Sequence, residues 1–560
     1  MDKKAIKTFA IESRKKLIEE VKYQASLLGI TAKGIAEPVE KAEGMEVYDI
    51  GASNPNTIYG EAIKQRQNLV KRINEKGFDN VVEEVAYTWF NRIIAIRFME
   101  VNDYLPTRVR VLSSQIEGKI EPDIVTESPH IDLDFTEEEI QQIYHLKNDN
   151  KLDELFRLLF IKQCNKLNEI LPELFEKTAD YTELLLSISF TNEDGVIRQL
   201  IDNISKEDFT DQVEIIGWFY QYYNTELKDD TFKQLKKRVK ISKERIPAAT
   251  QLFTPDWIVR YMVENSLGRL WLEGHPNSNL KENWKYYLDE TEQEPEVQIE
   301  LDKIREDSKN LKPVDIKIID PAMGSGHILV YAFEVLMQIY TSVGYSERDA
   351  AEFILKKNIY GLDIDDRAYQ IAYFAVMMKA RSYNHRILNK NIEPQICAIK
   401  ESNLITDELI DFVSEDDLRL ENDLKYLKRI FLDSKEYGSI INLKELNWDS
   451  IIKILSQIEN SQYSDINSIS HQQNVKSLYP LIKQSEILTR KYDIVITNPP
   501  YMGNRNMNKS LSNYLRNNYP DSKKDLFAVF IEKCQTMMNK NSFLAMITQH
   551  VFMFLSGCLF

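Results

Sequence analysis

The stretch YDIVITNPPY places an asparagine, two prolines and a tyrosine directly after a run of apolar residues. An exocyclic base amine is a poor nucleophile, because its lone pair is delocalised into the ring. The Asn498 side-chain oxygen and the Pro499 carbonyl could hold the two hydrogens of such an amine, while Pro499 and Pro500 fix both acceptors in place. Tyr501 offers an aromatic face for a base flipped out of a duplex. The pattern predicts catalysis by positioning and preorganised dipoles, and the plain alternative is a strand that ends in an Asn-Pro turn.

A second stretch, IIDPAMGSGH, indicates a buried strand that ends on Asp320, followed by a turn and a helix. Gly324 and Gly326 allow a tight turn and let a ligand approach the backbone. A dinucleotide fingerprint would need a third glycine where Leu329 stands, so NAD and FAD are disfavoured. The Asp320 carboxylate would repel a pyrophosphate but attract an ammonium group. This favours a ligand with an amino-acid end.

Two further segments add contacts for the same ligand. GLDIDD places Asp363 at a strand tip, where it could accept both hydroxyls of a ribose, while Asp365 and Asp366 fit a helix N-cap and a first-turn acid. A capping role is the alternative for Asp363. In FTPDWIVRYM, Thr254 and Pro255 are expected to be an N-cap and a first helical residue, and such a helix start can hold a carboxylate. Ammonium, ribose and carboxylate together describe S-adenosylmethionine.

These segments belong to a part of the chain, residues 241–560, in which strands and helices alternate. KIIDPAMGSGHILVYAFEVLMQIY and NIYGLDIDDRAYQIAYFAVMMKA each fit strand, turn and helix, with the first helix beginning at about His327. This is the repeating unit of a doubly wound, Rossmann-like α/β sheet, which binds ligands at the carboxyl ends of its strands. YDIVIT fits an internal strand buried on both faces. Residues 406–489 are helical and polar in pattern, which indicates an insertion in this domain.

Residues 1–240 are expected to form a mainly helical domain, because their apolar residues recur at three- and four-residue spacing. Several aromatic residues of this region fit a core better than a cofactor site: Trp89, Phe90, Phe98, Trp218 and Phe219.

Composition excludes a disordered or fibrous chain, since 43% of the 560 residues are hydrophobic and 28% are charged. The first residues lack the apolar core of a signal peptide, so we expect a cytoplasmic protein without a membrane partner. Four cysteines without a short-spaced pair disfavour a zinc site, and no metal is expected. A net charge of −16 is unfavourable for binding nucleic acid. The exception is KQLKKRVKISKER, residues 233–245, which is either a solvated helix face or a contact with the DNA backbone.

Together the motifs resemble those of an amino-group DNA methyltransferase whose cofactor region precedes its NPPY region. FTPDWIVRYM resembles the family's segment before the first strand, DPAMGSG its methionine-binding loop, GLDIDD its ribose acid and TNPPY its catalytic loop. The resemblance assigns Ala322 to cofactor binding and places Asn403 where a polar residue meets the adenine of the cofactor. DLFAVFIEKCQTMMNKNSFLAMITQ resembles the stretch after the catalytic loop, which implies that Asp525 and Phe527 line the target-base pocket.

The N-terminal EEVAYTWFNRIIAIRFMEVNDYLP and the long insertion look most like the PglX-type adenine methyltransferases of BREX phage-resistance systems. This resemblance implies methyl transfer from S-adenosylmethionine to adenine N6 of double-stranded DNA, in a phage-defence or restriction-modification setting with other defence proteins. Members of the group continue well beyond this length. We therefore expect a truncated chain with a sheet that is incomplete at the C-terminus, where NSFLAMITQHVFMFLSGCLF fits a strand and then the start of a helix.

Two other interpretations remain open. The NPPY arrangement suits any planar amino group, so RNA or a protein glutamine amide is an alternative substrate. The chain could also bind the cofactor and partner proteins of a defence complex without turnover. Labelled-methyl assays on DNA, RNA and protein separate the possible substrates. Co-purification with partner proteins in the absence of methylation would favour the interpretation without turnover.

Overall fold

The computed structural model describes residues 1–51, 55–176, 181–210, 212–276, 278–415, 417–462 and 465–550. The chain divides into two compact units, Met1–Thr225 and Glu226–Phe560, so the structural division precedes the change in sequence texture near residue 240. Within the described ranges, no helix has the length and apolar character needed to cross a membrane.

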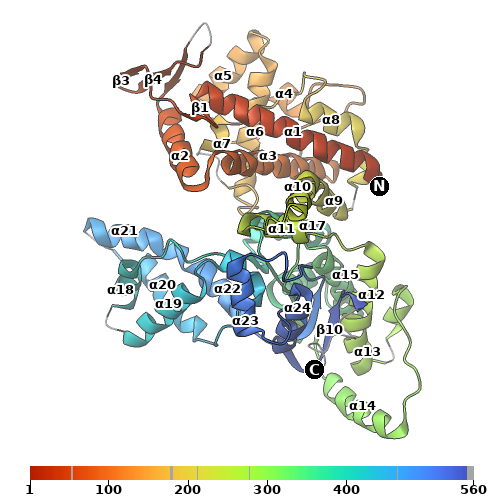
Figure 1. Cartoon of the computed structure of the whole chain (residues 1–560). Coiled ribbons are helices and arrows are strands. Elements are labelled where there is room, and N and C mark those ends of the chain that lie inside the picture. The colour runs from red at the N-terminus through yellow and green to blue at the C-terminus, as the bar shows by residue number, and fades with distance from the viewer. Residues whose placement is uncertain are drawn as a thin grey trace. The chain divides into compact units, whose positions relative to one another are not determined.

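The N-terminal unit is built mainly of helices, with a few short strands (Figure 1). Its helices are α1 (Lys3–Leu27), α2 (Glu61–Lys76), α3 (Phe78–Val101), α4 (Asp123–Glu127), α5 (Glu137–Asn148), α6 (Leu152–Asn168), α7 (Tyr181–Leu184), α8 (Val196–Asn203) and α9 (Glu214–Tyr223). β1 (Ile30–Thr31) pairs with β2 (Gly34–Ile35), and β3 (Glu40–Ala42), β4 (Met45–Tyr48) and β5 (Asn56–Tyr59) form an antiparallel sheet.

Aromatic rings of α1, α3 and α9 form the core of this unit. Phe9 lies 6.4 Å from Phe90 and 5.8 Å from Phe219, measured between ring centroids. The expected core positions are confirmed for Trp89, Phe90, Phe98 and Phe219, which are all buried. The expectation is wrong for Trp218, which is only partly buried and has the Lys3 ammonium 4.1 Å from its ring centroid. Trp218 fits the helical spacing of the core residues, but its side chain lies at the edge of the buried face of α9.

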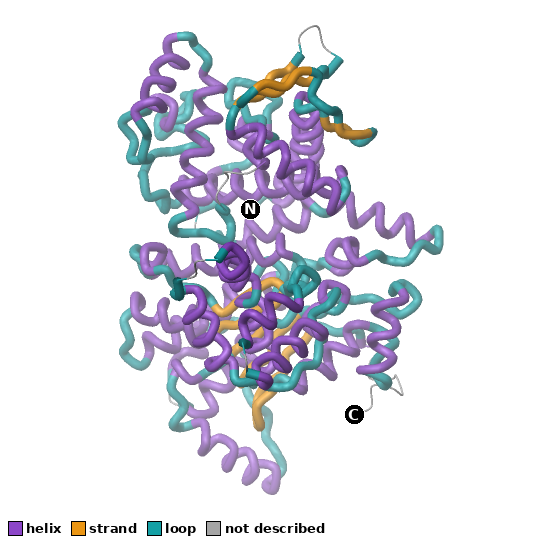
Figure 2. The backbone as a smooth tube through the Cα atoms, turned by 90° about the vertical axis from the view of Figure 1, so that its left-hand side faces the viewer, coloured by secondary structure: helices purple, strands orange, loops and turns teal. Residues whose placement is uncertain are grey.

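The second unit contains a five-stranded parallel sheet with the order β10-β9-β6-β7-β8. Figure 2 shows these strands surrounded by helices. The strands are β6 (Ile318–Asp320), β7 (Ile359–Asp363), β8 (Gln395–Ala398), β9 (Tyr492–Thr497) and β10 (Met538–Met546). The expectation of a mixed α/β domain with a parallel sheet is therefore confirmed.

The helices of this unit precede, connect and follow the strands, and those between β8 and β9 occupy the stretch expected as a helical insertion. They are α10 (Thr225–Lys236), α11 (Ile246–Thr250), α12 (Asp256–Val263), α13 (Arg269–Gly274), α14 (Pro295–Ser308), α15 (His327–Ser342), α16 (Glu347–Phe353), α17 (Asp366–Tyr383), α18 (Asp407–Ser414), α19 (Leu418–Ile430), α20 (Trp448–Glu459), α21 (Ile466–Asn474), α22 (Tyr479–Thr489), α23 (Lys509–Asn518) and α24 (Leu526–Thr536).

Helices cover both faces of the sheet. Tyr360 and Val495 point to one face, where they join an apolar cluster with residues of α18, α19, α20, α22 and α24. Successive strand residues point to opposite faces. Gly361 accordingly faces α15, and a Cβ atom added there would meet Leu329 at 2.8 Å.

The predicted strand before NPPY is confirmed as β9, whose residues Ile494, Val495 and Ile496 are fully buried. A strand buried on both faces needs apolar residues in succession, and the prolines that follow remove the donors that would extend the ladder. The strand expected near the end of the chain is also confirmed as β10, which forms an edge of the sheet among the described residues. The helix start expected after it lies outside the described residues.

Candidate active site

Three polar side chains meet at the carboxyl ends of adjacent strands. β6 lies between β7 and β9 in the sheet, and Asp320, Asp363 and Thr497 are the last residues of these three strands. Parallel strands bring their carboxyl ends to the same edge. The two motifs that the sequence keeps far apart are therefore neighbours here.

Asp320 is buried, with 1% of its surface exposed. Its Oδ1 atom accepts hydrogen bonds from the Thr497 hydroxyl at 2.7 Å and from the Ala322 backbone N–H at 3.1 Å. Its Oδ2 atom has no hydrogen-bond partner among the described residues. Burial raises the pKa of Asp320 to about 7, and the negative charge of Asp363 adds to this effect. An uncompensated buried carboxylate of this kind fits a cationic ligand such as an ammonium group.

The Asp363 side chain connects the end of β7 with the loop that contains Gly324 and Gly326. Its Oδ2 atom accepts a hydrogen bond from the Gly324 N–H and its Oδ1 atom accepts one from the Asp365 N–H, both at 2.9 Å. Burial raises the pKa of Asp363 to about 7. The predicted N-cap at Asp365 is confirmed, since its carboxylate accepts from the Arg367 N–H at 3.0 Å. Asp363 is thus not the residue that caps α17, and its side chain stays at the strand tip.

The two glycines of the loop differ in their surroundings. Both have left-handed backbones, with φ of +52° at Gly324 and +81° at Gly326. A Cβ atom at Gly324 would meet nothing within 4 Å, whereas one at Gly326 would meet Ala372 of α17 at 3.0 Å. The predicted helix start at His327 is confirmed directly after Gly326. Gly324 leaves its backbone open to a ligand, and Gly326 permits the close packing of α15 against α17.

This difference predicts unequal costs for two alanine substitutions. Gly324→Ala should lower the free energy of unfolding by about 1–2 kcal/mol, the cost of a left-handed non-glycine residue. Gly326→Ala should lower it further, because overpacking against α17 adds about 1–3 kcal/mol. Urea unfolding followed by circular dichroism measures both values. Equal losses in the two variants would contradict the packing role of Gly326.

The raised pKa of Asp320 predicts a pH dependence of stability. The folded pKa of about 7 lies above the ordinary value of 3.8 for an aspartate, so the contribution of this group to stability is fully present below about pH 4. It is lost progressively as the pH rises to 7. Asp320→Asn is neutral at every pH and keeps an acceptor oxygen for Thr497. The unfolding midpoint of the variant should therefore rise relative to wild type as the pH increases from about 4 to about 7, and a difference independent of pH would contradict the assignment.

The Asn498 amide is held in one orientation. Its Nδ2 atom donates to the Leu252 carbonyl at 3.3 Å and to the Thr254 hydroxyl at 3.2 Å. Its Oδ1 atom accepts only a long hydrogen bond of 3.3 Å, from the Tyr501 hydroxyl, among the described residues. The Pro499 carbonyl accepts no hydrogen bond from the described part of the chain. Two acceptors thus stand available at the end of β9, where Pro499 is buried and Pro500 is half-buried.

The Tyr501 side chain is held by a hydrogen bond of its hydroxyl and by a contact of its ring. Its hydroxyl donates to the Ile547 carbonyl at 2.6 Å, and its ring centroid lies 6.1 Å from that of Phe527. Phe527 is 2% exposed, and its ring lies at an angle of 38° to the Tyr501 ring. Asp525 is half-buried and caps α24 by accepting from the Phe527 N–H, and it also accepts from the Met502 N–H at 3.2 Å. Burial raises the pKa of Asp525.

The predicted cap at Thr254 is wrong. α12 begins at Asp256 without a side-chain cap, because Pro255 has a ψ of 139° and is extended rather than helical. Thr254 is buried, and its hydroxyl is used by Asn498 instead. The Asp256 carboxylate pairs with Arg260 at 2.7 Å. Thr254 and Pro255 therefore lie at the site, but Thr254 contacts the asparagine of NPPY rather than the helix start.

Asn403 lies in an exposed turn and uses its side chain locally. Its Nδ2 atom donates to the Asp433 carboxylate, and its Oδ1 atom accepts from the Asp433 N–H, both at 3.0 Å. Within the described ranges, no hydrogen bond connects Asn403 with Asp320, Gly324 or Asp363. A contact of Asn403 with adenine would require this pairing to open.

Sequence reasoning missed three groups that complete the site. These are the Thr497 hydroxyl on Asp320, the Leu252 carbonyl on Asn498 and the Ile547 carbonyl on Tyr501. Only Thr497 left a signal, because a hydroxyl at the end of a buried apolar strand needs a partner. Backbone carbonyls carry no signature in the residue types.

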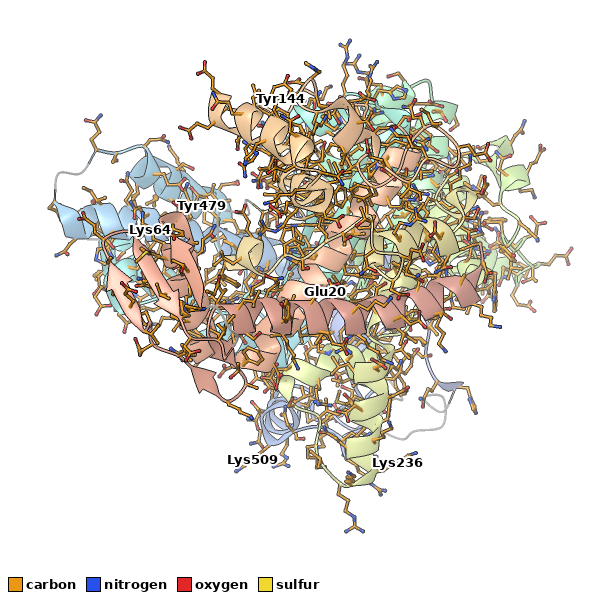
Figure 3. All side chains as sticks on the ribbon, turned by 90° about the horizontal axis from the view of Figure 1, so that it is seen from above. Glu20, Lys64, Tyr144, Lys236, Tyr479 and Lys509 are labelled. Atoms are coloured by element: carbon orange, nitrogen blue, oxygen red, sulfur yellow. The ribbon has the colours of Figure 1, made fainter. Side chains whose placement is uncertain are left out.

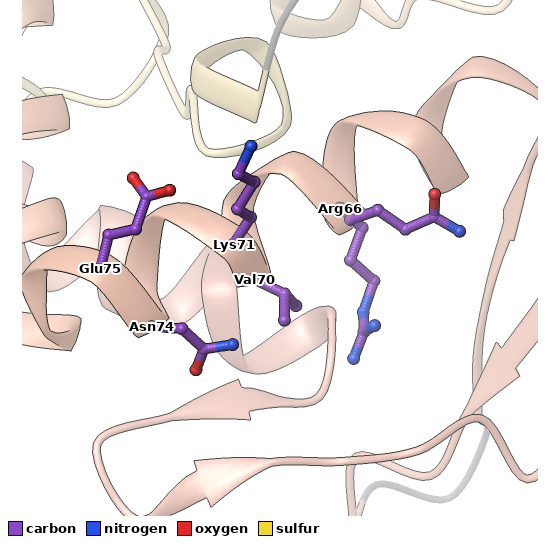
Figure 4. Close-up of a pocket in the computed structure, with 6 residues that line it drawn as sticks. Arg66, Val70, Lys71, Asn74 and Glu75 are labelled. Atoms are coloured by element: carbon purple, nitrogen blue, oxygen red, sulfur yellow. The ribbon is translucent and has the colours of Figure 1, made fainter. Parts of the chain in front are cut away.

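An open depression of about 470 Å³ lies elsewhere, over α2 of the N-terminal unit. Figure 4 shows its lining residues, which include Arg66, Val70, Lys71, Asn74 and Glu75. The Arg66 guanidinium is occupied by the Leu28 and Ala36 carbonyls, both at 2.8 Å. None of the predicted site residues lines this depression, so it does not compete with the site at the sheet edge.

Comparison with known proteins gives a matching family and two curated relatives. Residues 357–559 match the family described as Eco57I restriction-modification methylase. The chain is 44% identical over 592 aligned residues to the adenine-specific methyltransferase PglX of Lacticaseibacillus casei (strain Zhang), covering 100% of this chain and 47% of PglX. It is 36% identical over 585 residues to the adenine-specific methyltransferase BrxX of Escherichia coli O9:H4 (strain HS), again covering 100% of this chain and 47% of BrxX.

A solved structure, the DrdV–DNA complex, aligns with 98% of this chain and 36% of that chain, at 11% identity and a TM-score of 0.36. Likeness at this level adds no argument. The sequence identities carry the assignment, and the chain spans about half the length of the curated relatives it matches. The chain is therefore a relative, over its whole length, of the PglX-type adenine-specific methyltransferases.

Proposed function

We propose that this chain carries the cofactor and catalytic regions of a site-specific DNA methyltransferase that transfers a methyl group from S-adenosylmethionine to adenine N6. The observation that carries the proposal is the hydrogen bond of 2.7 Å between Thr497 and Asp320. It joins the strand that ends in Asn498 to the loop with the buried carboxylate. A site for an amino group and a site for an ammonium-bearing ligand thus share one edge of the sheet.

In this proposal the sheet is a Rossmann-like methyltransferase sheet, and its loops hold S-adenosylmethionine. Asp320 binds the ammonium group, Asp363 accepts the ribose hydroxyls, and the backbone of the loop with Ala322 and Gly324 contacts the methionine part. The bound cofactor supplies an electrophilic methyl group. The buried Asp320 carboxyl fits this role, because a cationic ligand favours its ionised form and opposes the burial that raises its pKa.

The amino group of the target base is held by the NPPY segment. The Asn498 Oδ1 atom and the Pro499 carbonyl accept its two hydrogens, which leaves the nitrogen lone pair available. Tyr501 provides the stacking surface, and its bond to Ile547 keeps the ring in position before the base arrives. Phe527 and Asp525 complete the base pocket by supporting Tyr501 and the loop after it. Preorganisation of this kind lowers the barrier without a strong base.

The relatives' names support adenine as the target. The resemblance to the PglX-type methyltransferases is the ground for proposing a BREX phage-defence setting, in which other defence proteins would be partners. The test is incubation of the purified chain with labelled-methyl S-adenosylmethionine and duplex DNA, RNA or bulk protein in parallel. Label recovered as N6-methyladenine from the DNA is the expected result. Label in RNA or in glutamine alone would overturn the choice of substrate. Cofactor binding without transfer to any substrate would favour a non-catalytic subunit.

A further inference from the structure

A group of exposed cations stands out on a chain whose net charge is −16. Lys236 ends α10, and Lys237, Arg238 and Lys240 follow it in the turn that leaves the helix. All four residues are exposed, and Figure 3 shows Lys236 at the end of its helix. From the sequence alone, this segment could be either a solvated helix face or a contact with DNA.

The turn is attached to the loop that follows NPPY. The Ile241 N–H donates to the Asn506 carbonyl at 3.1 Å, and the Lys240 ammonium donates to the Arg505 carbonyl. The same loop is joined to a third segment, since the Asn504 N–H donates to the Lys524 carbonyl at 2.9 Å. Three segments that are distant in the sequence thus lie side by side. Six of their exposed cations are called the cationic patch here: Lys236, Lys237, Arg238, Lys240, Arg505 and Lys524.

The cationic patch differs from the other basic residues of its own segment. Arg245 pairs with Asp230 at 2.6 Å, and Lys243 pairs with Glu401, so the charges of these two residues are already balanced by carboxylates. Within the part of the chain that the structure describes, none of the six patch residues forms an ion pair with a carboxylate. Glu244 and Asp521 are exposed acids of the same segments, and the local balance remains positive.

The place of the cationic patch beside the NPPY segment favours a contact with DNA over a solvated helix face. Arg505 stands four residues after Tyr501, so the cationic patch continues directly from the segment that would hold the target base. A base drawn out of a duplex remains bonded to a sugar and two flanking phosphates. A surface that binds these phosphates has to lie beside the base site. Its side chains have to be cationic and not already paired with carboxylates.

We propose that the cationic patch binds the phosphate backbone of duplex DNA beside the adenine held at Asn498. This inference rests on the proposed function and adds the surface that positions the duplex. Patch side chains contact phosphates and not base edges, so they contribute affinity without sequence preference.

Salt dependence of DNA binding tests the proposal. The triple variant Lys236→Gln, Lys237→Gln and Arg238→Gln is compared with wild type by fluorescence anisotropy on a labelled duplex at several salt concentrations. Each phosphate contact contributes about 0.9 to the slope of log affinity against log salt for duplex DNA. We expect the triple variant to bind more weakly at low salt and to have a slope shallower by about 2–3.

A second triple variant provides the control. Lys357, Lys453 and Lys476 are exposed lysines of the same unit, outside the three joined segments. Their replacement by glutamine changes the net charge equally and should leave the slope at the wild-type value. An equal loss of slope in both variants would show that only total charge matters, and it would overturn the proposal. So would a full slope in the patch variant, absence of duplex binding by wild type, or preference of the patch for RNA.

The outcomes also separate this inference from the proposed function. Calorimetric titration of S-adenosylmethionine should give wild-type affinity in the patch variant, because no patch residue lies in the cofactor loops. A shallower slope in a protein that never methylates DNA would leave the cationic patch standing and remove the catalytic proposal. Methylation by wild type with an unchanged slope in the patch variant would do the reverse.

Discussion

Replacing Asn498 with alanine is expected to lower the rate of methyl transfer to DNA by about a hundred- to a thousandfold. This is the range seen when one preorganised polar group is removed from a catalytic site. The substitution deletes the Oδ1 acceptor for the target amine. It also frees the Thr254 hydroxyl and the Leu252 carbonyl, which now hold the amide at 3.2 Å and 3.3 Å. The loss should appear in kcat, since the amide contributes most where charge develops on the nitrogen.

Asn498→Asp separates the acceptor from the orientation of the amide. The carboxylate retains an acceptor oxygen, but it cannot donate to the Leu252 carbonyl and would be repelled by it. We therefore expect a loss close to that of the alanine variant. Asn539, an exposed residue of β10 that donates to Asp493, gives the matched control, and Asn539→Ala should retain the wild-type rate.

Cofactor binding distinguishes a catalytic defect from a folding defect. Single-turnover transfer and calorimetric titration of S-adenosylmethionine are measured on the same preparations. Asn498→Ala should keep the wild-type affinity, because in the proposed site Asn498 holds the base and not the cofactor. Full activity of this variant would refute the assignment, and loss of cofactor affinity together with activity would point to a structural role at β9.

The second large effect is expected at Asp320. Asp320→Asn should weaken S-adenosylmethionine binding by about ten- to a hundredfold, the equivalent of about 1.5–3 kcal/mol for a hydrogen bond to a charged group. The isosteric amide keeps an oxygen for the Thr497 hydroxyl and the Ala322 N–H but loses the negative charge that would face the ammonium group. Asp320→Ala should lose more, because it also leaves the Thr497 hydroxyl without its partner.

Calorimetric titration measures these affinities without requiring catalysis, and Asp407→Asn is the control. Asp407 is an exposed first-turn acid of α18 that pairs with Lys428, so its replacement should leave binding unchanged. Thermal unfolding of each variant confirms that the chain is folded. Wild-type affinity in folded Asp320→Asn would refute the ammonium site. No binding in folded wild type would remove the cofactor assignment itself.

The sequence by itself determined the local elements of this protein. The end of β6 at Asp320, the start of α15 at His327 and the strand Tyr492–Thr497 all follow from short patterns of apolar residues, glycine and proline. Such patterns are sufficient because strand burial and turn geometry depend on neighbours in the chain. The cap at Asp365 was predictable for the same reason.

The tertiary structure alone decided how these elements serve the site. Thr254 fits a helix cap by its sequence, yet it binds Asn498, which lies 244 positions later in the chain. Asp320 meets Thr497 across 177 positions, and Trp218 lies at the border of the core despite its helical spacing. A hydroxyl or a carboxylate can satisfy its hydrogen bonds locally or across the fold, and the residue type is the same in both cases. Only the packing of β6 beside β9 selects between these partners, because it brings the two strand ends within hydrogen-bonding distance.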